Sequence, residues 1–216
     1  MFDVHVLFPT PVAKIKYDNH DELKNKVLDF IKTNPELEVD GITSPELKHF
    51  FNSSEIEEEF FDYVSDESFK QFLINSANIF SEQVMGFESQ NMIITDCWLN
   101  KCYENGFQNF HNHANSFISG TYYVNYNPKL HSQLKFSNPL YHSVSNPYID
   151  LNTERYTQFN HSETNCDFIE EGFLLLWMSH LSHGYDINTR NERITLSMNF
   201  MPSVLKSGPY KFKIEK

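Results

Sequence analysis

Three features that would mark particular classes of protein are missing from this sequence. No apolar run approaches the ~20 residues that a helix needs to cross a bilayer, and the first ten residues lack the basic start and apolar stretch of a signal peptide. Lysine and arginine number 17 against 29 acidic residues, a net charge of −12, and they form no evident cluster. Nucleic acid is therefore a disfavoured partner, because a surface that binds phosphates needs clustered basic residues.

Cysteine is also scarce. Cys97, Cys102 and Cys166 form no C-x-x-C pair and are odd in number. This pattern predicts reduced core thiols rather than a disulfide framework. Together with the missing membrane and secretion signals, it favours a cytoplasmic protein without a membrane partner.

Aromatic residues, by contrast, are abundant. The chain has 20 Phe, 11 Tyr and 2 Trp among 216 residues, which is enough burial to exclude disorder as a description of the whole chain. The length fits one domain. We expect an extended start and helical annex over 1–86, a β core over 87–204 with an insertion at 137–162, and a C-terminal tail over 205–216.

The first part of the chain is predicted to be mostly helical. Prolines near the start favour an edge strand within residues 4–17, and residues 42–54 show no clear period. Three helical stretches are expected: one carrying Leu23, Val27, Phe30 and Ile31 and ending at Asn34-Pro35, one beginning near Ser54, and one carrying Phe69, Phe72, Leu73, Ala77, Phe80 and Val84 and ending at Gly86.

After residue 86 the apolar pattern changes to a period of two. Candidate strands are 92–103, 116–126, 133–136, 166–170, 173–178 and 193–200. Glu170-Glu171-Gly172 resembles a tight hairpin turn between two of them. Many short strands predict a mainly β fold, an antiparallel sandwich or barrel with the helices packed on one sheet.

The strand from Arg193 to Phe200 separates apolar from polar residues. Ile194, Leu196, Met198 and Phe200 fall on one face, and Arg193, Thr195, Ser197 and Asn199 fall on the other. The polar face would point either into a barrel mouth or into solvent. On alternation alone, solvent is the simpler interpretation.

Histidines give the sequence its chemical signal. His111 and His113, two residues apart at a strand end, would project to the same side and share one metal, although imidazole alone does not name the metal. By itself the pair is more simply explained as two surface histidines. His183 follows a buried strand and Arg193 comes ten residues later, which strengthens the metal interpretation. His180 is the rival distal ligand.

In this order, the motifs resemble the Fe(II)/2-oxoglutarate-dependent oxygenase superfamily, and more narrowly a bacterial and phage group of 2OG-Fe(II) oxygenases with a His-x-His motif. The resemblance covers nearly the whole chain. It is carried by 7–11, Trp98-Leu-Asn100 with Asn105-Gly106, His111-Asn-His113 with 119–124, 136–139, 177–184 and 193–199.

The resemblance implies a double-stranded β-helix, the cupin-like jelly-roll, that binds Fe(II) and the co-substrate 2-oxoglutarate. His111 and His183 would bind the iron, and Arg193 would bind the far carboxylate of 2-oxoglutarate, with Thr195 beside it. The superfamily usually has Asp or Glu where His113 stands. His113 is then either a third, neutral ligand or leaves that position to water or an anion. The implied reaction is a dioxygenase hydroxylation of a C–H bond.

Several alternatives stay open. A cupin-like three-histidine metal dioxygenase without 2-oxoglutarate explains His113 but leaves Arg193 without a role. A catalytically inactive barrel would serve as a binding or virion module. The substrate is a protein side chain or a small molecule, a homo-oligomer is compatible with the sequence, and 137–162 is a substrate lid or a surface loop. The aromatic residues near the motif line the pocket or belong to the core: Trp98, Tyr103, Phe110, Tyr122 and Tyr123.

Overall fold

Two antiparallel sheets enclose the site of interest in the computed structural model, which describes residues 5–6, 8–51, 60–64, 67–89, 91–139, 154–157 and 160–214. The larger sheet has the order β1-β9-β6-β11-β4-β3-β2. Its strands are β1 (Ala13–Lys16), β2 (Val39–Asp40), β3 (Leu47–Phe50), β4 (Met92–Cys102), β6 (Ile118–Asn125), β9 (Phe173–Met178) and β11 (Arg193–Pro202).

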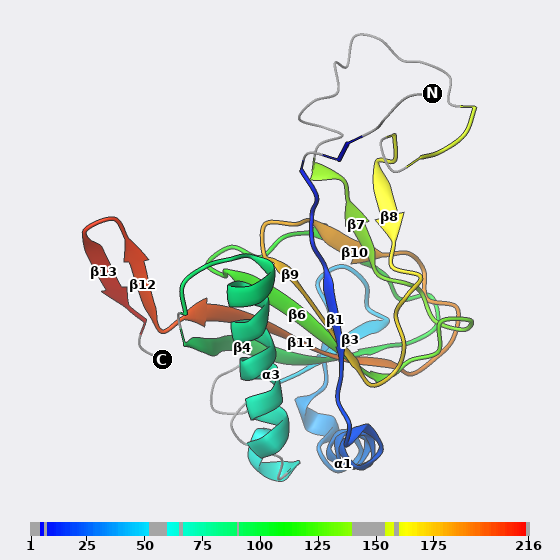
Figure 1. Ribbon diagram of the computed structural model, residues 1–216. Coiled ribbons are helices and arrows are strands. Elements are labelled where there is room, and N and C mark those ends of the chain that lie inside the picture. Colours follow the sequence, from blue (N-terminus) through cyan, green and yellow to red (C-terminus); the bar gives the residue numbers. More distant parts are fainter. Residues whose placement is uncertain are drawn as a thin grey trace.

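The smaller sheet has the order β5-β10-β7-β8. Its strands are β5 (Gln108–His111), β7 (Lys135–Ser137), β8 (Glu163–Asn165) and β10 (His183–Tyr185). The result is the jelly-roll, or double-stranded β-helix, with helices on the large sheet, and the predicted fold class is confirmed (Figure 1).

Helices α1 (His20–Thr33) and α3 (Glu67–Ile79) cover one face of the large sheet, and a π-helical turn at Phe80–Val84 extends α3 (Figure 1). Their apolar residues, such as Leu23 and Leu73, join one buried cluster with Leu196 and Met198 of β11. The apolar face of β11 is therefore committed to the helices. Its polar face must point to the other side, toward the small sheet.

Most element boundaries follow local signals in the sequence. Helix α1 ends at Thr33, directly before Asn34-Pro35 as predicted, and β1 is an edge strand. Gly86 ends the third helical stretch with φ +74°, a conformation that favours glycine. Val84, expected in the apolar stripe, is 49% exposed. The predicted helix near Ser54 lies in part outside the described residues. Within the described part, residues 60–63 are helical.

Two strand predictions are wrong. Residues 166–170 form no strand, because Cys166 and Ile169 are both buried at a spacing of three, and the strand lies just before them at Glu163–Asn165. The hairpin at Glu170-Glu171-Gly172 is also wrong, since β8 pairs with β7, whereas β9 pairs with β1 and β6. Gly172 has φ +81° in a turn between the two sheets.

Residues 42–54 gave no period, yet they contain β3. Leu47 and Phe50 at its two ends are both buried, so the strand shows no alternation. It forms by pairing with β4, a contact distant in the sequence. The expected C-terminal tail forms a hairpin of β12 (Val204–Ser207) and β13 (Tyr210–Lys213), which projects from the body (Figure 1).

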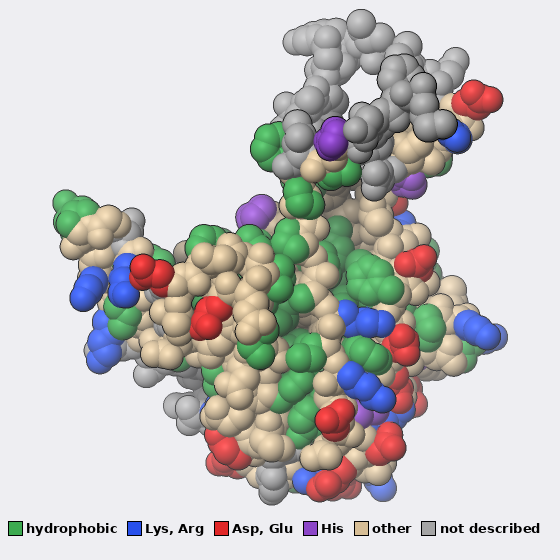
Figure 2. Space-filling model, viewed as in Figure 1, with side chains coloured by type: hydrophobic (Ala, Val, Ile, Leu, Met, Phe, Trp, Pro, Cys, Tyr) green, Lys and Arg blue, Asp and Glu red, His purple; other side chains and the backbone are tan. Residues whose placement is uncertain are grey.

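The thiols follow the expectation from composition, whereas several basic side chains gather at one place on the surface. Acidic and basic side chains are interspersed around α1, and lysines gather on the projecting hairpin (Figure 2). All three cysteines are buried and free. None of the helices in the described part of the chain is long and apolar enough to cross a membrane. Most of the predicted insertion, residues 140–153 and 158–159, lies outside the described residues.

Candidate metal centre and co-substrate pocket

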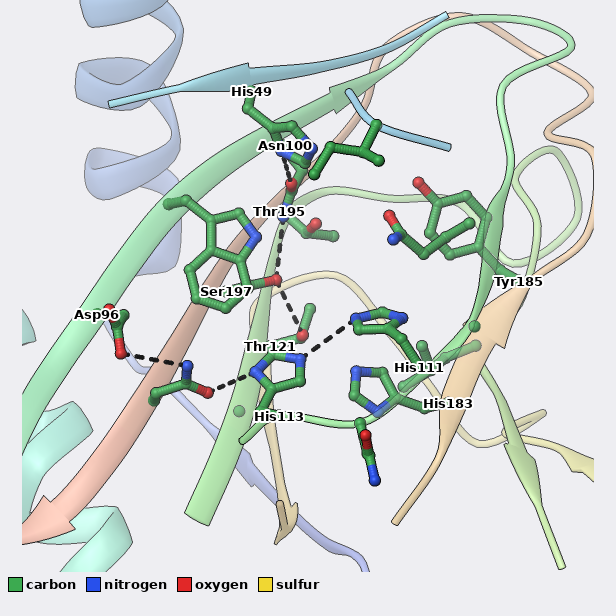
Figure 3. A pocket seen from close by; sticks show the side chains of 18 of the residues that line it. His49, Asp96, Asn100, His111, His113, Thr121, His183, Tyr185, Thr195 and Ser197 are labelled. Carbon is green, nitrogen blue, oxygen red and sulfur yellow. Dashed lines mark hydrogen bonds between the residues drawn. The ribbon is translucent and has the colours of Figure 1, made fainter. Parts of the chain in front are cut away.

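A cavity of about 560 Å³ lies between the two sheets. Its floor is the polar face of β11 with parts of β4 and β6, and its opposite wall comes from β5 and β10 (Figure 3). The interpretation that this polar face meets solvent is wrong. Arg193 and Thr195 are each 2% exposed and Asn199 is 7% exposed, because the small sheet covers them.

His111, His113 and His183 converge in this cavity. His111 ends β5 and His183 begins β10, and the register of the two strands sets them directly opposite each other. One ring nitrogen from each of the three lies within 4.8 Å of the others. His180, the rival ligand, is exposed and outside this group.

Hydrogen bonds set the tautomer of all three rings. Each Nδ1–H donates to an oxygen: His111 to the carbonyl of Asn109 at 2.9 Å, His183 to the carbonyl of Leu181 at 3.0 Å, and His113 to Oδ1 of Asn199 at 2.6 Å. Each Nε2 is then left with a lone pair and no proton.

The lone pairs point toward one another. Nε2 of His113 lies 3.2 Å from Nε2 of His111. Two unprotonated nitrogens at this distance repel each other unless a cation lies between them. Imidazoles anchored through Nδ1 with Nε2 free are the usual form of metal-ligating histidine, so the donor set fits a divalent transition metal.

Burial favours the neutral form of two of the rings, His113 and His183. It lowers the pKa of His183 to about 3, with a further contribution from neighbouring His111. Burial also lowers the pKa of His113, against the hydrogen bond to Asn199, which raises it. Metal binding requires unprotonated imidazole, and the cavity supplies it for these two rings without a proton to displace at neutral pH.

Arg193 occupies another part of the same cavity. Its Nε donates to the carbonyl of Ser132 at 3.2 Å, and its guanidinium lies 4.2 Å from the ring centre of Tyr185. Within the described residues, no carboxylate forms an ion pair with it. A buried charge without a partner is costly, so this guanidinium is poised to bind an anion.

Three buried tyrosines surround the Arg193 guanidinium. Its distances to the ring centres of Tyr123 and Tyr126 are 5.6 and 5.9 Å. The hydroxyls of Tyr123, Tyr126 and Tyr185 are buried and have no hydrogen-bond partner among the described residues. Hydroxyl donors beside a guanidinium are suited to a carboxylate.

Sequence reasoning missed most of the tyrosines around Arg193. It proposed Tyr123 only as a pocket aromatic, and Tyr126 and Tyr185 not at all. One signal was present for Tyr185, which stands two residues after His183 and therefore on the same side of a strand. Of the other aromatics, Trp98 lines the cavity and stacks on His113 at 5.4 Å, Tyr122 is core, and Phe110 is 41% exposed.

Comparison with known proteins agrees with this geometry. A family model described as "Putative 2OG-Fe(II) oxygenase" matches residues 96–199, just under half of the chain. No curated protein matches. A prolyl-4-hydroxylase from Pseudomonas putida is similar in structure, with a TM-score of 0.55 and 13% identity over 88% of this chain and 92% of that one.

Two further solved structures share the fold. The epimerase SnoN from nogalamycin biosynthesis has a TM-score of 0.61 at 9% identity, over 90% of this chain and 77% of that one. HygX from Streptomyces hygroscopicus, with nickel and 2-oxoglutarate bound, has a TM-score of 0.55 at 11% identity, over 90% of this chain and 84% of that one. At such identities the likeness establishes the fold.

The fold is a jelly-roll, and its cavity combines three converging histidines with a buried arginine. Residues 96–199 match the model of the 2OG-Fe(II) oxygenase family, and the fold agrees with that match. Iron(II) and 2-oxoglutarate are the cofactor and co-substrate that the family description names.

Proposed function

We propose that the protein is an Fe(II)/2-oxoglutarate-dependent dioxygenase that hydroxylates a C–H bond of a protein side chain or a small molecule. One observation carries this proposal: three histidine Nε2 lone pairs share one cavity with a buried guanidinium that has no counter-ion among the described residues. When bound, iron(II) and 2-oxoglutarate supply oxidation by O₂ coupled to decarboxylation of the co-substrate to succinate and CO₂.

The metal would be held by His111, His113 and His183. Of the two options left open by the sequence, the tautomers support His113 as a third neutral ligand, because its Nε2 points to the same place as that of His111. The side chain does not turn away to leave the position to water. Trp98, stacked on His113, limits the rotation of this ring.

The far carboxylate of 2-oxoglutarate would bind to Arg193, with Thr195 beside it on the same strand face. Tyr123, Tyr126 and Tyr185 would donate their free hydroxyls to it or line its pocket. A guanidinium matches a carboxylate through two parallel hydrogen bonds. Burial of this group keeps water from competing for the carboxylate.

The alternatives explain less of this geometry. A three-histidine dioxygenase without 2-oxoglutarate accounts for the metal site but leaves a buried, unpaired Arg193 without a function. An inactive binding module would not require the histidine tautomers with Nε2 free, nor the tyrosine hydroxyls without a partner among the described residues, and so it leaves both features unexplained.

The cavity is wide enough to admit a substrate group beside the co-substrate, and its lining does not name that group. The buried free cysteines support a cytoplasmic location, of a bacterium or of a phage-infected host.

The test combines metal binding with turnover. Purified metal-free protein is titrated anaerobically with Fe(II), and succinate release is then followed after 2-oxoglutarate and O₂ are added. His111→Ala and His183→Ala should abolish both metal binding and succinate release. His180→Ala, a matched exposed control, should retain them. Metal binding and succinate release that survive in His183→Ala would refute the proposed site.

A further inference from the structure

The three histidines differ in what holds them. His111 and His183 each donate to the backbone carbonyl two residues earlier. His113 instead donates to the side-chain amide of Asn199, 86 residues away on β11. His113 is thus the one member of the group whose ring depends on another side chain for its orientation.

Asn199 is itself held by two neighbouring strands. Its Oδ1 also accepts a hydrogen bond from Oγ of Ser119 at 3.0 Å. Its Nδ2 donates to Oδ2 of Asp96 at 3.3 Å (Figure 3). The sheet register pairs Asn199 with Asp96 on β4 and with Ser119 on β6. The register shifts immediately after Asn199, and such a bulge re-aims side chains beside functional sites.

These contacts fix the orientation of the amide. Two donors, from His113 and Ser119, meet its oxygen, and a carboxylate meets its nitrogen. Flipping the amide would turn its oxygen toward the Asp96 carboxylate, which can only accept a hydrogen bond, and the two oxygens would repel each other. The chain of hydrogen bonds from Asp96 through Asn199 to His113 therefore has one direction, and it permits only the His113 tautomer with Nε2 free.

We infer that Asp96 and Asn199 are positioning residues for His113, and that Asp96 supplies, through the Asn199 amide, the negative charge that three neutral imidazoles do not. Asp96 lines the cavity, and within the described residues its carboxylate forms no ion pair with lysine or arginine. Asp40, the other carboxylate of the lining, is neutralised by Lys48. The inference rests on the proposed function, because it requires His113 to bind metal.

The role of Asn199 also follows from ligand chemistry. An acceptor behind a ligating imidazole raises the basicity of the opposite nitrogen and holds the ring in place, and loss of such a partner typically lowers metal affinity 10- to 100-fold. A carboxylate one step further back polarises the amide and strengthens its oxygen as an acceptor.

Co(II) alone is the probe, measured by calorimetry and by its visible absorption, which reports the ligand set. Asn199→Leu, similar in size but without hydrogen bonds, should bind Co(II) about 10- to 100-fold more weakly and change the spectrum. Asp96→Asn should weaken binding by a smaller factor. Asp40→Asn removes the same charge from the same cavity outside the chain of hydrogen bonds, and should bind as the wild type does.

The double variant Asp96→Asn/Asn199→Asp decides the matter if Asn199→Leu fails to fold. It keeps both side-chain sizes and every hydrogen bond while exchanging the amide and the carboxylate. Asn199→Asp alone places two carboxylates against each other and should bind Co(II) more weakly than the wild type, whereas the double variant should recover wild-type affinity or better. Such non-additivity is the mark of direct coupling.

The outcomes separate the two claims. A wild-type protein that binds no Co(II) would overturn the proposed function itself. Wild-type binding with equal affinity and spectrum in folded Asn199→Leu would overturn the positioning of His113. A folded double variant no better than Asn199→Asp, or an Asp40→Asn protein as weak as Asp96→Asn, would overturn the role of Asp96.

Discussion

The proposed contact between Arg193 and 2-oxoglutarate can be tested with one conservative substitution. Arg193→Lys keeps the charge but replaces a planar fork with a single ammonium. Arg193 is 2% exposed and lies over the ring of Tyr185, so the shorter group cannot borrow water to restore the lost contact. One hydrogen bond to a charged group contributes about 1.5–3 kcal/mol. We therefore expect 2-oxoglutarate to bind about 10- to 150-fold more weakly, at 1.36 kcal/mol per tenfold change.

The assay is calorimetric titration of 2-oxoglutarate into Ni(II)-loaded protein. Arg190→Lys is the matched control, because Arg190 is exposed three residues earlier and lines no cavity wall. It should bind as the wild type does. A thermal melt of each variant accompanies the titration, and we expect Arg193→Lys to lose far more affinity than stability. Equal affinities in Arg193→Lys and the wild type would refute the assignment and favour the three-histidine dioxygenase that does without 2-oxoglutarate.

Three further predictions concern stability, packing and turnover. Burial lowers the pKa of His183 to about 3 and that of His113 below its usual range. The unfolded chain therefore binds more protons than the folded one below pH ~6.5, and the metal-free protein should lose stability as the pH falls from there. The free energy of unfolding, measured by urea denaturation at several pH values, should depend less steeply on pH in His183→Gln than in the wild type. An equally steep dependence on pH would contradict the assignment of the effect to His183. Gly184→Ala would place a Cβ 2.6 Å from the backbone oxygen of Gln108. This contact would push β5, which carries His111, away from β10, which carries His183. We expect a stability loss of about 1–3 kcal/mol with weakened Co(II) binding, and metal affinity equal to the wild type's would show that strand spacing does not set the site. Finally, the iron-loaded protein should consume 2-oxoglutarate slowly without substrate, measured as succinate, and no succinate with iron demonstrably bound would favour the inactive binding module.

Local patterns in the sequence determined much of this protein. Helix α1 ends where Asn34-Pro35 forbids its continuation, and β9 spans the predicted residues because its apolar run has clear limits. The His-x-His pair was identified because residues two apart at a strand end project to the same side. The later histidine and Arg193 joined it through the order of the motifs in the family that the sequence resembles. Side-chain directions along a strand are encoded within a few neighbouring residues.

Other features were decided by contacts between distant parts of the chain. β3 has no alternation and exists because β4 offers it a partner, and residues 166–170 turn instead of extending because Cys166 and Ile169 both reach one buried cluster. Neither contact leaves a periodic trace in the sequence.

The site shows the same division most clearly. Alternation along β11 separates Arg193 and Asn199 from the apolar residues, but it does not say which face another layer will cover. The small sheet buries that polar face. Only this burial encloses the Arg193 guanidinium and brings Tyr126 and Tyr185 beside it. The link from Asp96 through Asn199 to His113 depends likewise on the register of β4 against β11, which no single strand contains. A strand determines the two directions its side chains take, and the tertiary structure determines what they meet.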